Sequence, residues 1–255
     1  MYHEVTDTPE RVKEIRKIDP TYSLSTQQFE DQIAYLHKSG YKTVSPDEII
    51  HQQSNRKKIC VITFDDGYLG NYKFGFPILN KYQFIATIFV TVCGIPEDPY
   101  MTWDQLRELS NNGFSIQSHT MTHRALEELN EEDIYYELSE SKMIIEKELG
   151  KQVDYLSLPF GSGKKRVFEI AGEVGYRAVF TSSLYDIDLN EKPAKIGRIA
   201  IKDRHNQDAF QNIITRDSKA YYKMKISSLT KNMVKKIVGI NNYRRVYRFV
   251  YRIEI

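Results

Sequence analysis

Two adjacent carboxylates, Asp65 and Asp66, follow the apolar run Ile59–Phe64 and precede Gly67. Such a pair can bind a cation, accept a proton as a general base, or cap the segment that follows. Neighbouring side chains of an extended strand point to opposite faces, so both carboxylates reach one site only if the strand ends between them. Gly67 supplies the turn for such an ending. A lone Asp-Asp-Gly sequence is more often a simple turn, so chemistry here requires ligands from elsewhere in the chain.

The required ligands occur at His119 and His123, at the end of a second apolar segment, Phe114–Gln117. A spacing of four residues places both imidazoles on the same side of a helical turn or a tight loop. With one carboxylate they predict a His-His-Asp metal site that keeps open coordination positions. Mixed nitrogen and oxygen ligands favour Zn²⁺, with Co²⁺ and Ni²⁺ as alternatives. The competing interpretation is a pair of surface histidines near a turn.

Three short motifs, taken in order along the chain, resemble those of one protein family. The sequences TFDDGY at 63–68, HTMTH at 119–123 and LPFGSG at 158–163 are similar to motifs of the polysaccharide deacetylases, the NodB-homology group also called family-four carbohydrate esterases. Each motif alone is weak, but their order and spacing match over roughly residues 2–201. The opening MYHEV resembles the poly-N-acetylglucosamine deacetylase branch, in which the motif order is permuted and an N-terminal Tyr-His supplies the general acid.

The resemblance assigns roles to the carboxylates and histidines of the first two motifs. Asp65 is the expected general base, and Asp66, His119 and His123 are the expected metal ligands. The chemistry agrees, because a carboxylate beside the metal that does not bind it can take a proton from water. A divalent metal in turn lowers the pKa of bound water and polarises an acetyl carbonyl.

The third motif, Pro159-Phe160-Gly161, is expected to form part of the substrate site. Its turn would bring the backbone N–H of Phe160 towards the oxyanion that develops during acyl transfer; the alternative is an ordinary Pro-Gly turn. Pro159, Gly161 and Tyr68 are the expected substrate-binding residues. Tyr68 and Trp103 could stack on sugar rings, with core packing as the alternative.

Two positions depart from the family pattern. Many relatives carry an arginine that orients the catalytic base where this chain has Ser157, and Arg198 is the candidate substitute. Many relatives also carry a C-terminal Leu-x-His motif, and the sequence IGRIAIKDRH has no histidine in that register. Because of the MYHEV opening, His3 is favoured as the general acid over His205, which lies past the last predicted strand. The alternative for His3 is a buried structural histidine.

The chain of 255 residues is 41% hydrophobic and 27% charged, which is ordinary for a soluble globular protein and long enough for one large α/β domain. Strands are expected at 2–5, 41–44, 59–64, 84–92, 114–118, 155–158, 176–182 and 196–201. Helices are expected from a cap at Ser25 or Thr26 to Gly40, from a start at 45–48, at 72–82 and 103–112, from a cap at Asn130 to Gly150, and at about 164–173. This alternation predicts an α/β fold with a parallel sheet and covering helices. An open doubly wound sheet and a closed barrel both fit; the resemblance favours a distorted (β/α) barrel of the NodB-homology type, with all three motifs at strand C-terminal ends.

Residues 216–255 differ in character from the rest of the chain. They hold eleven Lys or Arg against two acidic residues, a local charge of +9, which leaves −7 for residues 1–215 out of the total of +2. The sequence therefore divides into a catalytic domain at 1–215 and a basic amphipathic helical tail at 216–255. The tail either packs on the barrel with a solvated basic face or makes peripheral contact with a membrane or an anionic polymer.

The sequence also carries expectations about location. No apolar stretch approaches the roughly 20 residues of a transmembrane helix, and MYHEV lacks the basic and apolar regions of a signal peptide. As it stands, the sequence predicts a cytoplasmic protein, with membrane association through the tail as an alternative. If an export segment precedes Met1 in the full protein, the cell envelope is expected instead.

The sequence favours one function over two alternatives. The leading hypothesis is a metal-dependent hydrolase that removes N-acetyl groups from an N-acetylglucosamine-containing polysaccharide; a polysaccharide partner is expected and nucleic acid is not. The first alternative is an O-acetyl esterase acting on xylan or a similar polymer, because the same attack by water cleaves esters. The second is a noncatalytic glycan-binding domain, suggested by the missing arginine and the uncertain acid.

Overall fold

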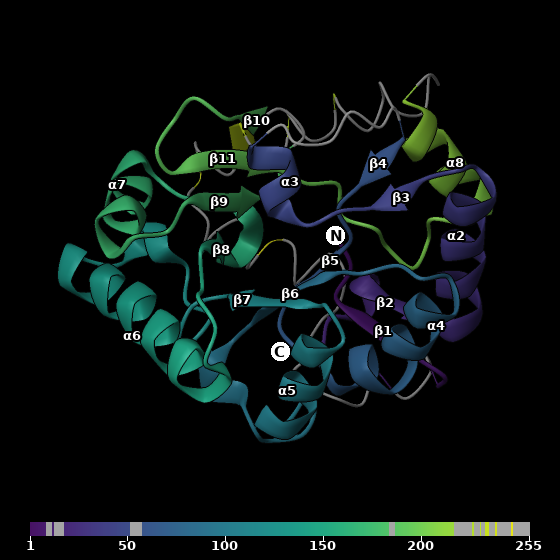
Figure 1. Ribbon diagram of the computed structural model, residues 1–255. Coiled ribbons are helices and arrows are strands. Elements are labelled where there is room, and N and C mark those ends of the chain that lie inside the picture. Colours follow the sequence, from purple (N-terminus) through teal and green to yellow (C-terminus); the bar gives the residue numbers. More distant parts are fainter. Residues whose placement is uncertain are drawn as a thin grey trace.

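The computed structural model describes residues 1–8, 12, 18–51, 58–183 and 187–216, together with residues 226, 230, 233, 234, 238 and 246 (Figure 1). The main sheet contains β5 Thr63–Phe64, β6 Thr87–Val90, β7 Ser115–Ser118, β8 Tyr155–Ser157, β9 Ala178–Thr181, β10 Ile187–Asp188 and β11 Ala194–Gly197. Two smaller pairs are β1 Glu4–Thr6 with β2 Ser23–Ser25, and β3 Lys42–Thr43 with β4 Ile59–Cys60. The helices are α2 Thr26–Lys38, α3 Pro46–Ile50, α4 Phe76–Lys81, α5 Trp103–Asn111, α6 Glu131–Leu149, α7 Lys165–Val174 and α8 Gln207–Thr215.

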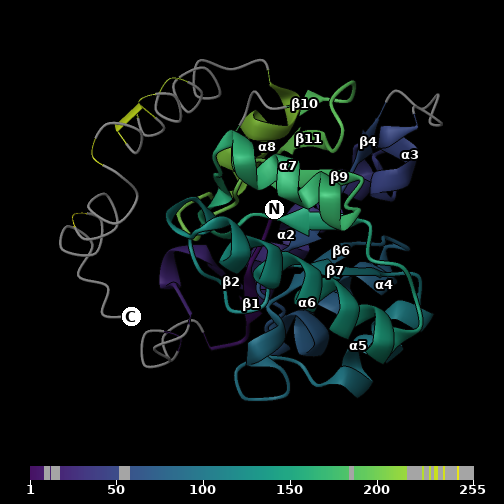
Figure 2. The ribbon, with the colours of Figure 1, turned by 90° about the vertical axis from the view of Figure 1, so that its left-hand side faces the viewer.

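The main sheet has the order β10-β11-β9-β8-β7-β6-β5, in which six strands run parallel and β10 pairs antiparallel with β11. Helices α5, α6 and α7 connect successive strands, and α6 and α7 lie side by side on the outside of the sheet (Figures 1 and 2). Parallel strands need such crossovers, so the alternation in the sequence predicted this topology correctly. The fold is the expected distorted (β/α) barrel.

The first three residues fill the gap between the two ends of this curved sheet. Tyr2 donates a backbone hydrogen bond to Thr63 (2.8 Å) and accepts one from Asp65 (3.0 Å) on the β5 side. On the other side, the N–H of Ile201 donates to the carbonyl of Met1 at 2.9 Å. The chain start therefore lies between β5 and the segment that follows β11, which places the next residue, His3, at the same end of the barrel as Asp65.

Alternating side chains on the strands build two separate cores. On β6, Ile88 and Val90 join the large cluster beneath the helices, whereas Phe89 joins a second cluster with Tyr155 and Phe180. A strand that is buried on both faces is expected to be apolar throughout, as parallel strands are. The second cluster fills the barrel interior and lies beneath the residues that end the strands.

The predicted helix starts are confirmed by their capping geometry. The Ser25 side chain accepts from the backbone N–H of Gln28, whose own side chain caps Ser25 in return, and Ser45 makes the same capping box with Glu48. Asn130 caps α6, which ends at a left-handed Gly150. These local rules fix the helix boundaries to within a residue or two.

Three predicted elements differ in the structure. The run Ile59–Phe64 is two strands: β4 pairs with β3 in a small sheet, and β5 begins the main sheet. The helix predicted at 72–82 is a wider π turn at Asn71–Gly75 followed by α4, with Pro77 in the first turn of α4 where its missing N–H costs little. The last predicted strand, 196–201, is shifted to Ala194–Gly197, because the chain leaves the sheet at Arg198.

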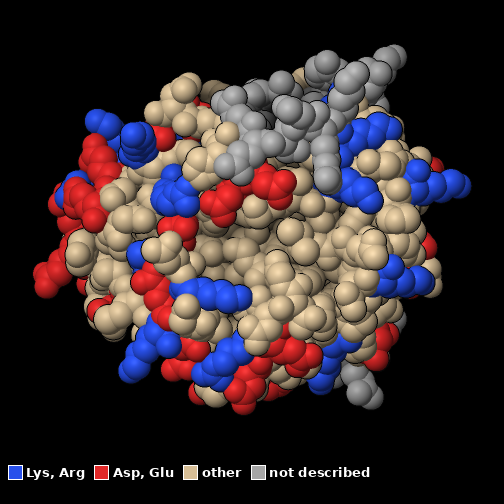
Figure 3. Space-filling model, viewed as in Figure 1, with Lys and Arg blue, Asp and Glu red and all other residues tan. Residues whose placement is uncertain are grey.

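Most of the basic tail at 216–255 lies outside the described residues, so its predicted amphipathic helix and the boundary at 215 stay predictions. In the described part of the chain, no helix combines the length and apolarity needed to cross a membrane. On the face shown in Figure 3, Lys and Arg are interspersed with Asp and Glu around a largely uncharged centre.

Candidate active site

Asp65 and Asp66 reach the same site because β5 ends directly before them, as the sequence predicted. Asp66 has φ 73° and Gly67 has φ 84°, so two consecutive left-handed residues follow directly after Asp65. A side chain on Gly67 would approach Val90 as closely as 3.0 Å, which explains why glycine is required there. The reversal turns both carboxylates towards the same cavity, and both are buried, with exposed fractions of 2% and 8%.

Arg198 holds the Asp65 carboxylate through two hydrogen bonds, Nη1 to Oδ1 at 2.6 Å and Nη2 to Oδ2 at 2.8 Å. Ser157 completes the arrangement, since its hydroxyl donates to Asp65 Oδ2 at 3.1 Å and accepts from Arg198 Nη2 at 2.7 Å. The guanidinium lies over the rings of Phe89 and Phe180, 5.2 Å and 5.6 Å from their centroids. Arg198, the candidate substitute for an arginine at position 157, thus contacts the predicted base directly.

This ion pair decides the charge of Asp65. Burial alone raises the pKa of a carboxyl, but the Arg198 guanidinium, His119 and the hydrogen bonds from Arg198 outweigh it and hold the pKa of Asp65 well below its usual range. Asp65 is therefore ionised throughout the physiological pH range, as a proton acceptor must be.

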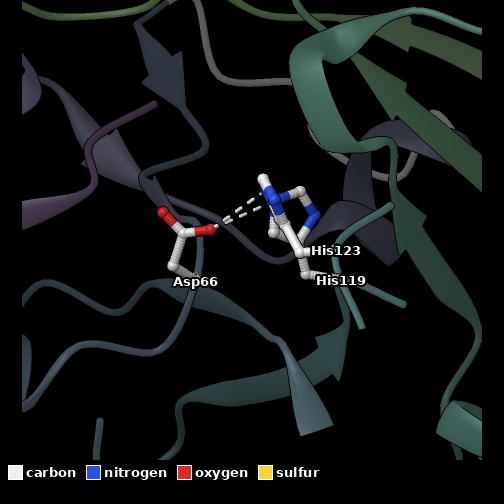
Figure 4. Close-up of side chains that lie close together, drawn as sticks. All are labelled: Asp66, His119 and His123. Carbon is white, nitrogen blue, oxygen red and sulfur yellow. Dashed lines mark ion pairs between the residues drawn. The ribbon is translucent and has the colours of Figure 1, made fainter. Parts of the chain in front are cut away.

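Asp66, His119 and His123 converge on one point (Figure 4). Asp66 Oδ1 lies 3.4 Å from the Nε2 atoms of both His119 and His123, and one ligand atom from each residue falls within 4.8 Å of the others. His119 comes from the end of β7, and a loop with φ 68° at Thr120 and φ 59° at His123 returns the second imidazole to the first. The spacing of four thus acts through a tight loop rather than a helical turn.

The electrostatics of this triad fit a divalent cation. Nδ1 of His119 donates to the carbonyl of Ser157 at 2.9 Å, which leaves the lone pair of Nε2 facing Asp66. Burial lowers the pKa of His119 to about 4, with the neighbouring His123 adding to the effect, so the imidazole is neutral at pH 7. A neutral nitrogen and a carboxylate oxygen that face each other at 3.4 Å repel unless a positive ion lies between them.

His3 lies in the same cavity, whereas His205 does not line it. The His3 ring packs on Tyr22 with centroids 4.6 Å apart, and its buried Nδ1 has no hydrogen-bond partner among the residues that the structure describes. Burial lowers the pKa of His3 to about 4, against the opposing charge of Asp65. His205 uses its Nδ1 to accept from the N–H of Lys202 at 3.2 Å. The geometry therefore brings His3, and not His205, to the predicted base and metal ligands.

The cavity that these groups share has a volume of about 390 Å³. It is lined by Met1, His3, Ile18, Asp19, Tyr22, Asp65, Asp66, Tyr68, Tyr100, His119, His123, Leu158, Phe160, Gly161, Ser182, Arg198 and Ala200. Among the predicted substrate residues, Tyr68 and Gly161 line it, while Pro159 is buried and does not, and Trp103 packs against the main core. Phe160 lines it with φ 59° and packs its ring on His123 at 5.0 Å; the oxyanion role of its N–H stays a prediction.

Sequence reasoning missed several residues of this cavity. Tyr22 is the last residue of a short helical turn, Pro20–Tyr22, that Asp19 caps, and the Tyr100 ring stacks on that of Tyr68 with centroids 5.3 Å apart. Neither position belongs to a motif, and neither lies at the end of a predicted strand. The only signal in the sequence was a tyrosine in a loop, which by itself does not distinguish a site residue from a packed one.

Comparisons with known proteins place the chain in one family. Residues 52–179 match the family model "Polysaccharide deacetylase", which is half of the chain. The Bacillus subtilis protein YxkH is 33% identical over 160 residues, 61% of this chain and 57% of that protein, so the chain spans little more than half of its length. The poly-beta-1,6-N-acetyl-D-glucosamine N-deacetylase of Staphylococcus aureus is 26% identical over 212 residues, 76% of this chain and 72% of that enzyme.

A solved structure shows the same architecture. The Streptococcus pyogenes deacetylase PplD, in complex with acetate, superposes with a TM-score of 0.74 at 25% identity, covering 84% of this chain and 96% of PplD. The fold, the order of the three motifs and the family match all lead to one assignment. The chain belongs to the polysaccharide deacetylase family.

Proposed function

We propose that this protein is a metal-dependent hydrolase that removes N-acetyl groups from an N-acetylglucosamine-containing polysaccharide. The observation that carries the proposal is the convergence of Asp65, the Asp66-His119-His123 triad and His3 on one cavity. The resemblance to the Staphylococcus aureus N-deacetylase supports the choice of an N-acetylated polymer.

Amide hydrolysis needs an activated water, charge stabilisation at the acetyl oxygen, and a proton for the departing amine. A zinc ion held by Asp66, His119 and His123 would supply the positive charge that acidifies water and polarises the carbonyl. The protein itself holds the remaining groups in place. The Ser157 carbonyl fixes the tautomer of His119 and so directs Nε2 of that imidazole to the site.

Asp65 is proposed to accept the proton of the attacking water. Its position against Arg198 and Ser157 leaves the carboxylate little freedom to rotate, so the same orientation is presented in every cycle. Because the pKa of Asp65 is held low, the carboxylate is always available as an acceptor, although it is a weak base. Arg198 therefore provides orientation and ionisation at the cost of basicity.

His3 is proposed to protonate the departing amine. With a pKa of about 4 its imidazole is neutral at pH 7, so it must take up a proton during the cycle before it can give one to the amine. The charge of Asp65 favours the protonated form, and Nδ1, which has no hydrogen-bond partner within the described part of the chain, is one atom through which the ring can exchange the proton.

Acetate release from N-acetylglucosamine oligomers tests the proposal. Wild-type protein loaded with Zn²⁺, Co²⁺ or Ni²⁺ is expected to release acetate, and a chelator or Asp65→Asn is expected to abolish it. Asp104→Asn, at an exposed position on α5, is the matched control and should keep full activity. No release from chitin-type, β-1,6-linked and peptidoglycan-type substrates alike would contradict the proposal.

The two alternative functions are separated by the same assay. An O-acetyl esterase would cleave acetylated xylan at an unchanged rate after His3→Ala and would cleave no amide, because an alcohol leaves without protonation more readily than an amine. The suggestion of a noncatalytic glycan-binding domain rested on the missing arginine and the uncertain acid. Arg198 answers the first of these reasons, since it contacts Asp65 from another position.

A further inference from the structure

The loop that carries the two histidine ligands has an unfavourable backbone. Thr120 has φ 68° and His123 has φ 59°, both in the left-handed region. A β-branched residue such as Thr120 rarely adopts this conformation, because its side chain crowds the backbone. Such a loop keeps its shape only if contacts from the surrounding structure compensate for the strain.

Glu137 on α6 makes three of these contacts at the centre of the loop. Its Oε2 accepts from the backbone N–H groups of Met121 at 3.0 Å and Thr122 at 2.8 Å. Its Oε1 accepts from the hydroxyl of Thr122. The two backbone donors lie between the two ligands in sequence, so a single carboxylate holds the middle of the loop while His119 and His123 flank it.

A second contact one helical turn further along α6 supports the same loop. The hydroxyl of Ser141 pairs with that of Ser118 at 2.8 Å, and Ser118 Oγ accepts from the backbone N–H of Thr120 at 3.1 Å. Glu137 and Ser141 are four residues apart and share one face of α6, which contacts β7. Helix α6 therefore holds both the start and the middle of the ligand loop.

The Glu137 carboxylate depends on these donors. Its exposed fraction is 2%, and in the described part of the chain no ion pair joins it to a cation. A buried carboxylate without a positive partner needs hydrogen bonds to compensate for its lost hydration. The loop and the carboxylate thus stabilise each other, and removing the charge is expected to release the loop.

We propose that Glu137 is a positioning residue for the metal site, acting through residues 121 and 122 to hold His119 and His123 at binding distance. The inference rests on the metal site of the proposed function, but not on the substrate or the reaction. Outer groups of this kind typically change metal affinity by about 10- to 100-fold when they are removed.

Glu137→Gln is the sharpest substitution, because it keeps the size of the side chain. Only the carbonyl oxygen of the amide can accept, so its NH₂ group must face one of the donors that Glu137 now accepts from. Thr122→Val is a milder variant that removes the hydroxyl donor and keeps both backbone donors. Glu132→Gln, the same change at an exposed position of the same helix, is the matched control.

Zinc affinity is measured by competition with a chromophoric chelator, and the Co²⁺ absorption spectrum and the chelated-state Tm are recorded for each variant. Glu137→Gln is expected to weaken zinc binding at least tenfold and to alter the Co²⁺ spectrum. Thr122→Val is expected to weaken zinc binding by a smaller factor. Glu132→Gln is expected to change neither the zinc affinity nor the Co²⁺ spectrum. A purely structural glutamate would lower the chelated-state Tm and leave the affinity and the spectrum of the folded protein unchanged, which would overturn the proposal.

The remaining outcomes are also decisive. If Glu137→Gln does not fold, Thr122→Val decides, and zinc binding equal to wild type overturns the proposal. If wild-type protein binds no divalent metal, this inference and the metal dependence of the proposed function fail together. If zinc binding weakens as expected but wild-type protein releases no acetate from any substrate, only the proposed function fails.

Discussion

Arg198 and Asp65, which lie 133 residues apart in the sequence, form a buried two-point ion pair with N–O distances of 2.6 Å and 2.8 Å. A planar guanidinium can make this parallel contact and a lysine ammonium cannot. Removing one partner of a buried pair typically costs about 3–5 kcal/mol, because the other charge is left uncompensated. The pair therefore supports both the fold and the proposed base.

Arg198→Lys keeps a positive charge and loses the two-point contact. We expect kcat for acetate release to fall about 10- to 100-fold, which is typical when a group that orients the site is lost. The pKa of Asp65 should rise towards its ordinary value, so the acidic limb of the pH–rate profile should move to higher pH. Arg107→Lys, a partly exposed arginine on α5, is the control. An unchanged acidic limb would show that Arg198 does not set the ionisation of Asp65.

Relocating the arginine to position 157 gives a second test of the same pair. The Ser157 hydroxyl already contacts both Asp65 and Arg198, so a longer side chain from that position starts within reach of the carboxylate. Ser157→Arg combined with Arg198→Ser is expected to recover at least about tenfold of the activity lost in Arg198→Ser alone. No recovery, in a double variant that folds, would mean that a guanidinium can contact Asp65 productively only from position 198.

If His3 and not His205 is the general acid, replacing each histidine by glutamine should affect the reaction rates differently. His3→Gln should lower kcat on an N-acetyl substrate by about 100-fold or more, which is within the range for loss of a general acid. The loss should be much smaller on an activated ester with a good leaving group. His205→Gln should leave both rates within about twofold. Equal losses on amide and ester would indicate that His3 shapes the cavity and does not transfer the proton.

The presence of His205 should lower the free energy of unfolding of the protein in mild acid. Burial, with the charges of Arg204 and Lys202 adding to it, lowers the pKa of His205 from 6.5 to about 4. Between these values the unfolded chain binds a proton that the folded chain does not, so this contribution falls as pH drops from about 6.5 to about 4. Because His205 is only partly buried, screening by solvent reduces this effect. Relative to His205→Gln, the wild type should therefore lose about 1–2 kcal/mol over this interval, measured by urea unfolding of chelated protein. A constant difference between the two proteins would contradict the lowered pKa.

Metal removal should destabilise the protein as well as inactivate it. Binding to the folded state at 100 times Kd contributes about 2.7 kcal/mol, which for a chain of this size corresponds to a Tm increase of roughly 5–10 °C. Zinc should therefore raise the Tm of chelated wild type and should not raise that of His123→Gln. His37→Gln, at an exposed histidine on α2, should respond as wild type does. A zinc-dependent rise in His123→Gln equal to that of wild type would place the metal elsewhere.

The basic tail, most of which lies outside the described residues, carries the remaining prediction. If Arg244, Arg245, Arg248 and Arg252 face anionic lipid, deletion of residues 241–255 should release the protein from acidic vesicles and leave hydrolysis of a small soluble substrate intact. Binding should weaken with salt, because it depends on charge attraction. If the deletion unfolds the domain, the apolar face of the tail belongs to the core.

Location in the cytoplasm, at a membrane or in the cell envelope remains a prediction that fractionation of the natural host would test.

The sequence by itself placed the candidate metal ligands and the candidate base at one site, because they follow predicted parallel strands and such strands present their carboxyl ends at one edge of a sheet. Asp65, Asp66, His119 and His123 could be placed from strand endings, turn residues and spacing, which are local properties. The tertiary structure alone decided which residues complete the site. Arg198 reaches Asp65, and the chain start brings His3 beside them, only because the sheet curves until residues 1–3 bridge its two ends. Contacts between segments so far apart depend on sheet curvature and strand order, which short-range patterns do not encode.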